Sequence, residues 1–115
     1  FTVEERKTLL TQSLRHLPNV RVDSFEGLTV DYAKKIQAGV LIQGLRAVVD
    51  FEYEISMANM NRKLVGEIET MLVFSAPEFY FISSRGVKEV ARNKGSVEGL
   101  VPAVVEKALR TKVGV

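Results

Sequence analysis

The stretch that most constrains the fold is Val40–Glu54, with the sequence VLIQGLRAVVDFEYE. It begins as an apolar run, is interrupted at Gly44, places Arg46 just beyond the interruption, and continues from Asp50 with acidic residues at helical spacing. A continuous apolar run of this kind is typical of a strand buried on both faces of a parallel sheet. We therefore expect a buried strand, a tight turn and the beginning of a helix to follow one another here.

The end of this predicted strand is the natural place for a ligand, because open α/β sheets bind ligands at the carboxyl edge of their strands. Gly44 lets a ligand approach the backbone, and Arg46 supplies a forked cation that suits phosphate oxygens. The carboxylates Asp50, Glu52 and Glu54 would lie in the first turns of the helix, where they favour the positive end of its dipole. Glu54 would also be able to reach the hydroxyl groups of a sugar.

The rest of the sequence predicts helices and strands in alternation. Thr2 and Glu5 match a capping box, and leucines at helical spacing follow them, which predicts a first helix over about Val3–Arg15. The further expected elements are a short strand around Val20–Phe25 that ends at Gly27, a helix over Leu28–Gln37, a helix from Asp50 to about Leu64, a strand over Glu69–Ala76, a helix that begins near Ser84 and ends before Gly95, and a final helix with Pro102 at its first position. Apolar strands that alternate with helices predict an α/β fold with a parallel sheet and right-handed crossovers.

Several side chains allow two interpretations. Ser83 and Ser84 precede a helix, so they could bind an anion at its N-terminus or simply cap it. Thr29 could contact a ligand at the carboxyl edge of the sheet or act as an N-cap. His16, the only histidine, is expected to cap a helix C-terminus, because catalysis would need a partner that is not visible nearby. The wide apolar arc over residues 51–64 indicates adaptable core packing and favours cover from two sides, including by another subunit.

Composition excludes several classes of function. The chain has 115 residues, 46% of them hydrophobic and 26% charged, which is ordinary for a single soluble domain. It has no cysteine, so disulfides, thiolate metal sites and thiol catalysis are excluded, and a cytoplasmic location is compatible. The net charge of +2 comes from basic residues scattered among acids, which does not favour nucleic acid as a partner. No apolar run approaches the length of a membrane span.

The segments QGLRAVVDFEYE, MANMNRKL and FYFISSRGVKEVA together resemble the bacterial phosphopantetheine adenylyltransferases, which are nucleotidyltransferases of coenzyme A biosynthesis. The similarity extends from FTVEER at the start to LVPAVVEKALR near the end. It implies that residues 1–115 form one nucleotidyltransferase domain with a Rossmann-like, doubly wound parallel sheet. Family members begin with a strand, a turn with a Thr/His-x-Gly-His motif, a helix, a second strand and a substrate-binding lysine. Because this sequence contains none of these, we expect it to be the C-terminal portion of such a domain, without the first strand-helix-strand unit.

The resemblance also implies a reaction, which is transfer of the adenylyl group of ATP to 4'-phosphopantetheine, giving dephospho-coenzyme A and pyrophosphate. Magnesium would be held mainly by the phosphates of ATP, since no cage of carboxylates is visible in the sequence. A homo-oligomer, and a hexamer in particular, is implied as well. Without the His-bearing turn, residues 1–115 alone are expected to be inactive. Two alternatives remain: a non-catalytic module for nucleotide binding or assembly, and a related nucleotidyltransferase with another acceptor.

Carried over by position, the family implies a set of site residues. Arg46 and Ser84 would be catalytic, and Thr29 and Gln43 would bind the pantetheine substrate. The ATP-binding residues would be Gly44, Leu45, Arg46, Glu54, Phe79, Tyr80, Phe81, Ile82, Ser83, Ser84 and Arg85.

Two of these positions depart from the family pattern. Gln43 stands where a basic residue is usual, and Arg85, followed by Gly86, stands where a third serine and a larger residue are usual. Arg85 could therefore add a cation to the phosphate pocket or could simply be exposed to solvent. Gln43 brings no charge to the phosphate of the acceptor.

Overall fold

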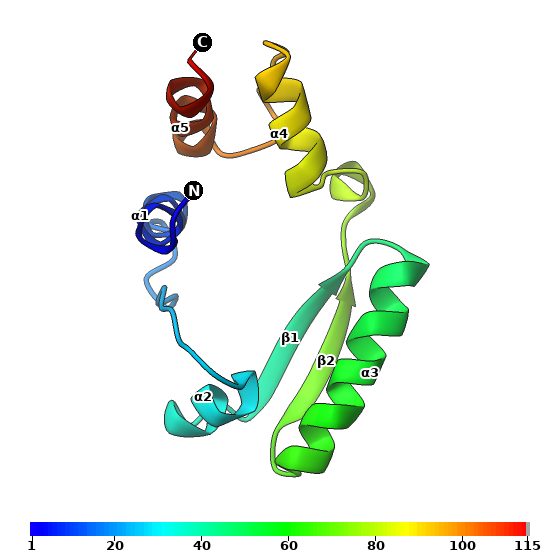
Figure 1. The fold of residues 1–115 in the computed structure, drawn as a ribbon. Coiled ribbons are helices and arrows are strands. Elements are labelled where there is room, and N and C mark those ends of the chain that lie inside the picture. The colour runs from blue at the N-terminus through cyan, green and yellow to red at the C-terminus, as the bar shows by residue number, and fades with distance from the viewer. Residues whose placement is uncertain (115) are drawn as a thin grey trace. The chain divides into compact units, whose positions relative to one another are not determined.

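The computed structural model describes residues 1–114, and the chain forms two compact units (Figure 1). One unit contains Phe1–Ser24 together with the residues from Ile82 onward, and the other contains Phe25–Phe81. The elements in chain order are α1 (Val3–Ser13), α2 (Thr29–Lys35), β1 (Val40–Leu45), α3 (Val48–Leu64), β2 (Glu69–Phe74), the 3-10 turn η1 (Pro77–Phe79), α4 (Ser84–Arg92) and α5 (Ala103–Val113).

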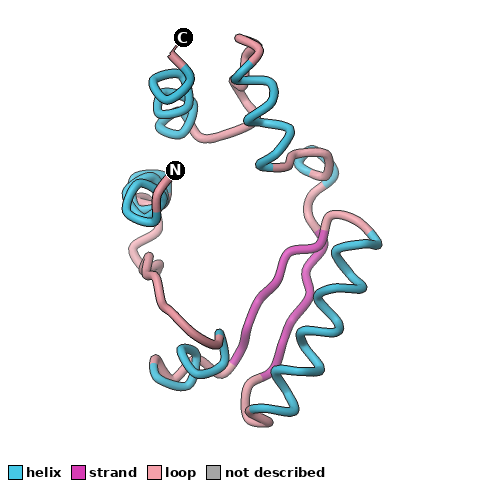
Figure 2. Tube along the Cα trace, viewed as in Figure 1, coloured by secondary structure: helices cyan, strands magenta, loops and turns pink. Residues whose placement is uncertain are grey.

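The unit Phe25–Phe81 is built on a parallel pair of strands (Figure 2). β1 and β2 pair in register from Val40 opposite Glu69 to Leu45 opposite Phe74. The crossover between them is α3, which packs against both strands. The expected α/β class with a parallel sheet is therefore confirmed, and the arrangement is consistent with a Rossmann-like nucleotidyltransferase fold.

β1 differs from the expected strand in two respects. The strand continues through Gly44 to Leu45, so Gly44 pairs with Val73 and does not form a turn. Its side chains also alternate in burial, with Leu45 only 2% exposed and Ile42 67% exposed. Full burial would need cover on both faces of the sheet, and in this unit the helix packs along only one of them.

α2 packs near the amino ends of the two strands. Its buried residues Val30 and Ala33 form a cluster with Ile68, which immediately precedes β2, and Leu41 of β1 packs against that cluster. The ring of Tyr32 stacks on Phe25, with 4.5 Å between the ring centroids. These contacts place the beginning of α2 away from the carboxyl edge of the sheet, where Thr29 would have to lie in the first of its two interpretations.

The other unit consists of α1, α4 and α5. The predicted capping box at the start of α1 is confirmed, because the Thr2 hydroxyl accepts from the Glu5 backbone N–H at 3.2 Å and the Glu5 carboxylate accepts from the Thr2 N–H at 2.6 Å. The Glu5 carboxylate also pairs with Lys112 of α5 at 2.6 Å. The hydrophobic core of this unit is formed by α4, α5 and the loop between them. Its buried members are Val87, Ala91, Val97 and Leu109.

Three predictions of local structure are wrong in detail. The predicted strand around Val20–Phe25 does not form, because no described residue pairs with this segment, although its apolar residues suit a strand. Pro102 is the N-cap of α5 and not its first helical residue. α1 ends at Ser13, so His16 lies beyond the helix, exposed, and not in its last turn.

The remaining boundaries agree with the sequence analysis to within a few residues. Within residues 1–114, no helix is both long enough and apolar enough to span a membrane.

Candidate functional site

The carboxyl end of β1 presents an open stretch of backbone, as the sequence predicts. A Cβ added to Gly44 would meet no atom within 4 Å, so the space above this residue is free for a ligand. The next side chain, Leu45, is buried and contributes packing, and its backbone carbonyl accepts from the Ser75 N–H, so Leu45 supports this edge of the sheet from within. Arg46 follows directly after the strand and is only partly exposed.

Arg46 is held in place by Asp50. One carboxylate oxygen, Oδ2 of Asp50, accepts from the Arg46 backbone N–H at 3.0 Å and from its Nε at 3.4 Å. The hydrogen bond from the Arg46 backbone and the charge of the guanidinium keep the pKa of the Asp50 carboxyl below its ordinary value. Asp50 is the third residue of α3. The start of this helix therefore fixes the positions of the Arg46 backbone N–H and of the Nε atom of its guanidinium group.

Glu54 lies one helical turn beyond Asp50 and therefore on the same side of α3, where it is partly buried. Gln43 shares a strand face with Leu41 and Leu45, and Gly44 faces the opposite side of the sheet. The Gln43 amide is partly buried and forms no hydrogen bond within the described residues. The amide is therefore not engaged by the backbone of the described residues.

The aromatic segment after β2 is exposed. The backbone N–H of Ser75 donates to the Leu45 carbonyl at 2.8 Å, which extends the strand pairing just beyond β2. η1 follows, and Phe79, Tyr80 and Phe81 are 53%, 56% and 70% exposed. Large apolar rings that are this exposed are available to stack on a planar ligand.

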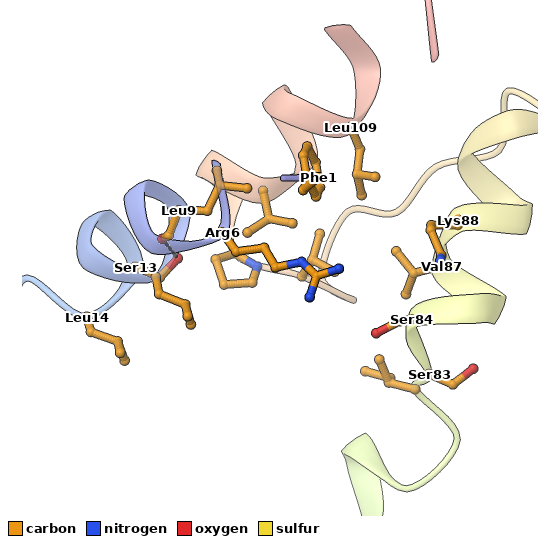
Figure 3. A pocket seen from close by; sticks show the side chains of 15 residues that line it. Phe1, Arg6, Leu9, Ser13, Leu14, Ser83, Ser84, Val87, Lys88 and Leu109 are labelled. Carbon is orange, nitrogen blue, oxygen red and sulfur yellow. Dashed lines mark hydrogen bonds between the residues drawn. The ribbon is translucent and has the colours of Figure 1, made fainter. Parts of the chain in front are cut away.

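Ser83 and Ser84 have different roles in the structure. Ser83 is the N-cap of α4, and its hydroxyl accepts from the Gly86 N–H at 3.1 Å. Ser84 is the first residue of the helix, and its hydroxyl points into a pocket where the Ser83 hydroxyl does not point (Figure 3). The N-cap interpretation thus holds for Ser83, and Ser84 is the serine available to a ligand.

The pocket belongs to the unit formed by α1, α4 and α5 and has a volume of about 650 Å³. Its wall is mainly apolar, and its polar side chains are Arg6 and Ser13 of α1 and Ser83, Ser84 and Lys88 at the start of α4 (Figure 3). Arg85 is exposed and does not line it.

The structure brings only some of the predicted site residues together. Gln43, Gly44, Leu45, Arg46 and Glu54 lie in the unit with the sheet, as do the aromatic residues 79–81. Ile82, Ser83, Ser84 and Arg85 belong to the other unit, so the division falls inside the segment expected to bind ATP. Thr29 begins α2 near the amino end of the sheet, away from Gln43 and Gly44. It is not an N-cap either, because Leu28 takes that position and α2 has no side-chain cap.

Two features were missed by the sequence analysis. Asp50 anchors Arg46, and the spacing of four residues between an arginine and an aspartate at a helix start could have indicated the contact. Arg6 and Lys88 meet at one pocket, which no local pattern could have shown because they are far apart in sequence.

The described residues do not form a metal cage. No group of three or more His, Cys, Asp or Glu side chains gathers within residues 1–114.

Comparison with known proteins gives consistent matches. A model of the cytidylyltransferase-like family matches residues 1–90. A phosphopantetheine adenylyltransferase of Bdellovibrio bacteriovorus is 64% identical over 113 residues, which are 98% of this chain and 71% of that protein. Proteins with the same name from Anaeromyxobacter sp. (strain K) and Anaeromyxobacter dehalogenans are each 51% identical over 114 residues, 99% of this chain and 70% of theirs.

Proposed function

This chain belongs to the phosphopantetheine adenylyltransferase family, within the cytidylyltransferase-like group, and on that premise we propose that it serves adenylyl transfer from ATP to 4'-phosphopantetheine. The observation that carries the proposal is the 64% identity to a protein of that name over 98% of the chain. The proposal is also supported by the open space at Gly44, which lies next to an arginine anchored by Asp50. Nucleotides bind to α/β sheets at the carboxyl edge of the strands, and Gly44 and Arg46 lie at that edge.

In the proposed reaction, a phosphate oxygen of 4'-phosphopantetheine attacks the α-phosphorus of ATP. A new oxygen–phosphorus bond forms as the bond to the bridging oxygen of the β-phosphate breaks, and pyrophosphate leaves in line. No covalent enzyme intermediate is required, so the protein acts by positioning the reactants and offsetting developing charge. Magnesium, held mainly by the phosphates, would supply further charge neutralisation when bound.

The residues of this chain take the following proposed roles. Arg46 contacts the phosphates while Asp50 fixes its backbone, and Glu54 contacts the ribose. Residues 79–82 surround the adenine, and Ser83, Ser84 and Arg85 lie toward the phosphates. Gln43 and Thr29 contact the pantetheine substrate. The hexameric state and the cytoplasmic location stay predictions.

The first test is whether the chain needs the rest of its relatives' sequence. We expect no pyrophosphate release above background from residues 1–115 alone, because the His-bearing turn and the lysine are absent from them. A hybrid protein, in which residues 1–115 are joined to the part of the Bdellovibrio relative outside the matched residues, should release pyrophosphate only when both substrates are present.

The same assay separates the alternatives. Activity of residues 1–115 alone would contradict the expected dependence on the His-bearing turn and the lysine. A folded hybrid protein that binds ATP but transfers nothing would favour a non-catalytic module, and transfer only to another acceptor would favour a related nucleotidyltransferase. Either result would overturn the proposed reaction.

A second prediction concerns Gln43, whose amide is not engaged by the described residues. An arginine there would make a charge-assisted contact to the acceptor phosphate about twice as strong as a neutral one. In the hybrid protein, Gln43→Arg should lower the KM for 4'-phosphopantetheine roughly tenfold, about 1.4 kcal/mol, and change the KM for ATP much less. Weaker acceptor binding with a lower Tm would instead mean that the new cation is buried without a partner.

A further inference from the structure

A second, smaller pocket lies at the end of α4, between the loop that follows this helix and α5, and we call it the α4–α5 loop pocket. Its polar lining includes Lys94 and Ser96 of the loop and Arg110 of α5, and its apolar lining includes the buried side chains of Val97 and Leu109. The volume is about 170 Å³. Drug-sized ligands need roughly 300 Å³ or more, so this pocket accepts only one compact group.

The α4–α5 loop pocket is distinct from the larger pocket described above. α4 has nine residues and is therefore roughly 13 Å long, and the two pockets lie near its opposite ends. Leu109 is the only described residue that lines both. None of the site residues predicted from the sequence lines the smaller pocket.

Two cationic side chains line the pocket and, among the described residues, no acidic one does. Lys94 forms no ion pair with a described residue. Arg110 donates from Nη2 to Oε1 of Glu106 at 2.6 Å, which leaves the other nitrogen atoms of its guanidinium group for a further acceptor. The Ser96 hydroxyl accepts from the Glu98 N–H at 3.2 Å, so its own hydrogen can be donated to a ligand.

The carbonyl end of α4, which would repel an anion, is already engaged by the loop. The Val90 carbonyl accepts from the Gly95 N–H at 2.9 Å, and the Ala91 carbonyl accepts from the Lys94 N–H at 3.0 Å, so these groups present less negative potential to the pocket. A Cβ on Gly95 would lie 2.7 Å from the Val90 side chain, so this close approach requires glycine. The packing fixes the backbone of Lys94 and Ser96 before any ligand binds.

From these observations we propose that the α4–α5 loop pocket binds a small inorganic oxyanion of the phosphate class. A phosphate ion has an oxygen atom for each of the three donors, Lys94, Ser96 and Arg110, whereas a carboxylate does not. The apolar side chains beside the two cations lower the local dielectric and strengthen their attraction for the ion. The bound ion joins the loop to α5. This site is separate from the proposed function, because it requires no nucleotide and no adenylyl transfer.

The test is a titration of the isotope-labelled chain with inorganic phosphate, in which two-dimensional NMR spectra follow the backbone amides of Gly95, Ser96 and Val97. These signals report on the α4–α5 loop pocket separately from the signals at the start of α4. We expect saturable shifts with phosphate and none with chloride at the same ionic strength. Saturable shifts confined to the start of α4 would overturn the proposal.

Two substitutions should change the affinity for phosphate in opposite directions. Lys94→Ala should weaken binding about fivefold, the scale of one partly exposed charged contact. Glu106→Gln should strengthen binding, because it releases the guanidinium group of Arg110 from its ion pair. Lys107→Ala is the matched control, since Lys107 is a cation of α5 that does not line the pocket, and its affinity should match that of the unchanged chain.

Equal affinities for the three variants would mean that phosphate responds only to the net charge of the chain, and would overturn the proposal. The dispersion of each amide spectrum shows whether the variant is folded. Where the chain alone gives no dispersed spectrum, the same variants are compared in the hybrid protein by the rise in Tm that phosphate causes. That rise should be smaller for Lys94→Ala and larger for Glu106→Gln, and an equal rise in both would contradict the site.

Discussion

Replacing Leu45 with alanine should lower the free energy of unfolding by about 2 to 5 kcal/mol, the usual cost of emptying a leucine site in a core. Leu45 ends β1 and is one of the two largest fully buried side chains of the described chain. The matched control is Ile42→Ala on the opposite face of the same strand, where the side chain is 67% exposed. That variant should lose no more than about 1 kcal/mol, the span of strand propensities.

Urea denaturation followed by circular dichroism would measure both variants, because the chain has no tryptophan for fluorescence. Equal losses would contradict the one-sided cover seen in the structure and would indicate that the Ile42 face is buried in solution. α3 also has exposed apolar residues, among them Phe51, Met60 and Leu64, and these side chains could likewise be buried in solution by a second subunit. The prediction of an oligomer rests on this kind of surface and is not tested by the structure.

Removing the guanidinium of Arg46 should cause the largest loss of activity. In the hybrid protein, Arg46→Ala should lower kcat/KM by roughly 10- to 150-fold, corresponding to about 1.5 to 3 kcal/mol for a hydrogen bond to a charged group. Arg62→Ala is the matched control, because Arg62 is on the same helix that follows β1 and pairs with Glu69 at 3.0 Å near the amino end of β2. Its replacement should leave the kinetic constants unchanged.

Asp50→Asn tests how Arg46 is positioned. The lowered pKa means that Asp50 is ionised at the neutral pH of the assay, so the amide would remove a charge and weaken two hydrogen bonds. We expect a smaller loss than for Arg46→Ala, and almost none when Arg46 is already alanine. Additive losses in the double variant would mean that Asp50 acts independently of Arg46, and unchanged kinetics for a folded Arg46→Ala would make Arg46 a surface residue.

Local features of the structure could be predicted from the sequence alone. The capping box of Thr2 and Glu5, the helix that begins at Ser84 and the strands at Val40 and Glu69 all follow from short-range patterns. Periodicity and capping act over a few residues, so the sequence contains all the information that they need. The family could also be identified, because the similarity covers nearly the whole chain.

Features that depend on distant residues were decided only by the tertiary structure. The apolar segment before Gly27 forms no strand because a strand needs a partner, and β1 is covered on one face because a helix packs on only that side. The placement of Thr29 near the amino end of the sheet likewise depends on packing against Ile68. Arg6 and Lys88 reach one pocket only because α1 and α4 fold into the same unit, and no local pattern encodes a contact across that separation.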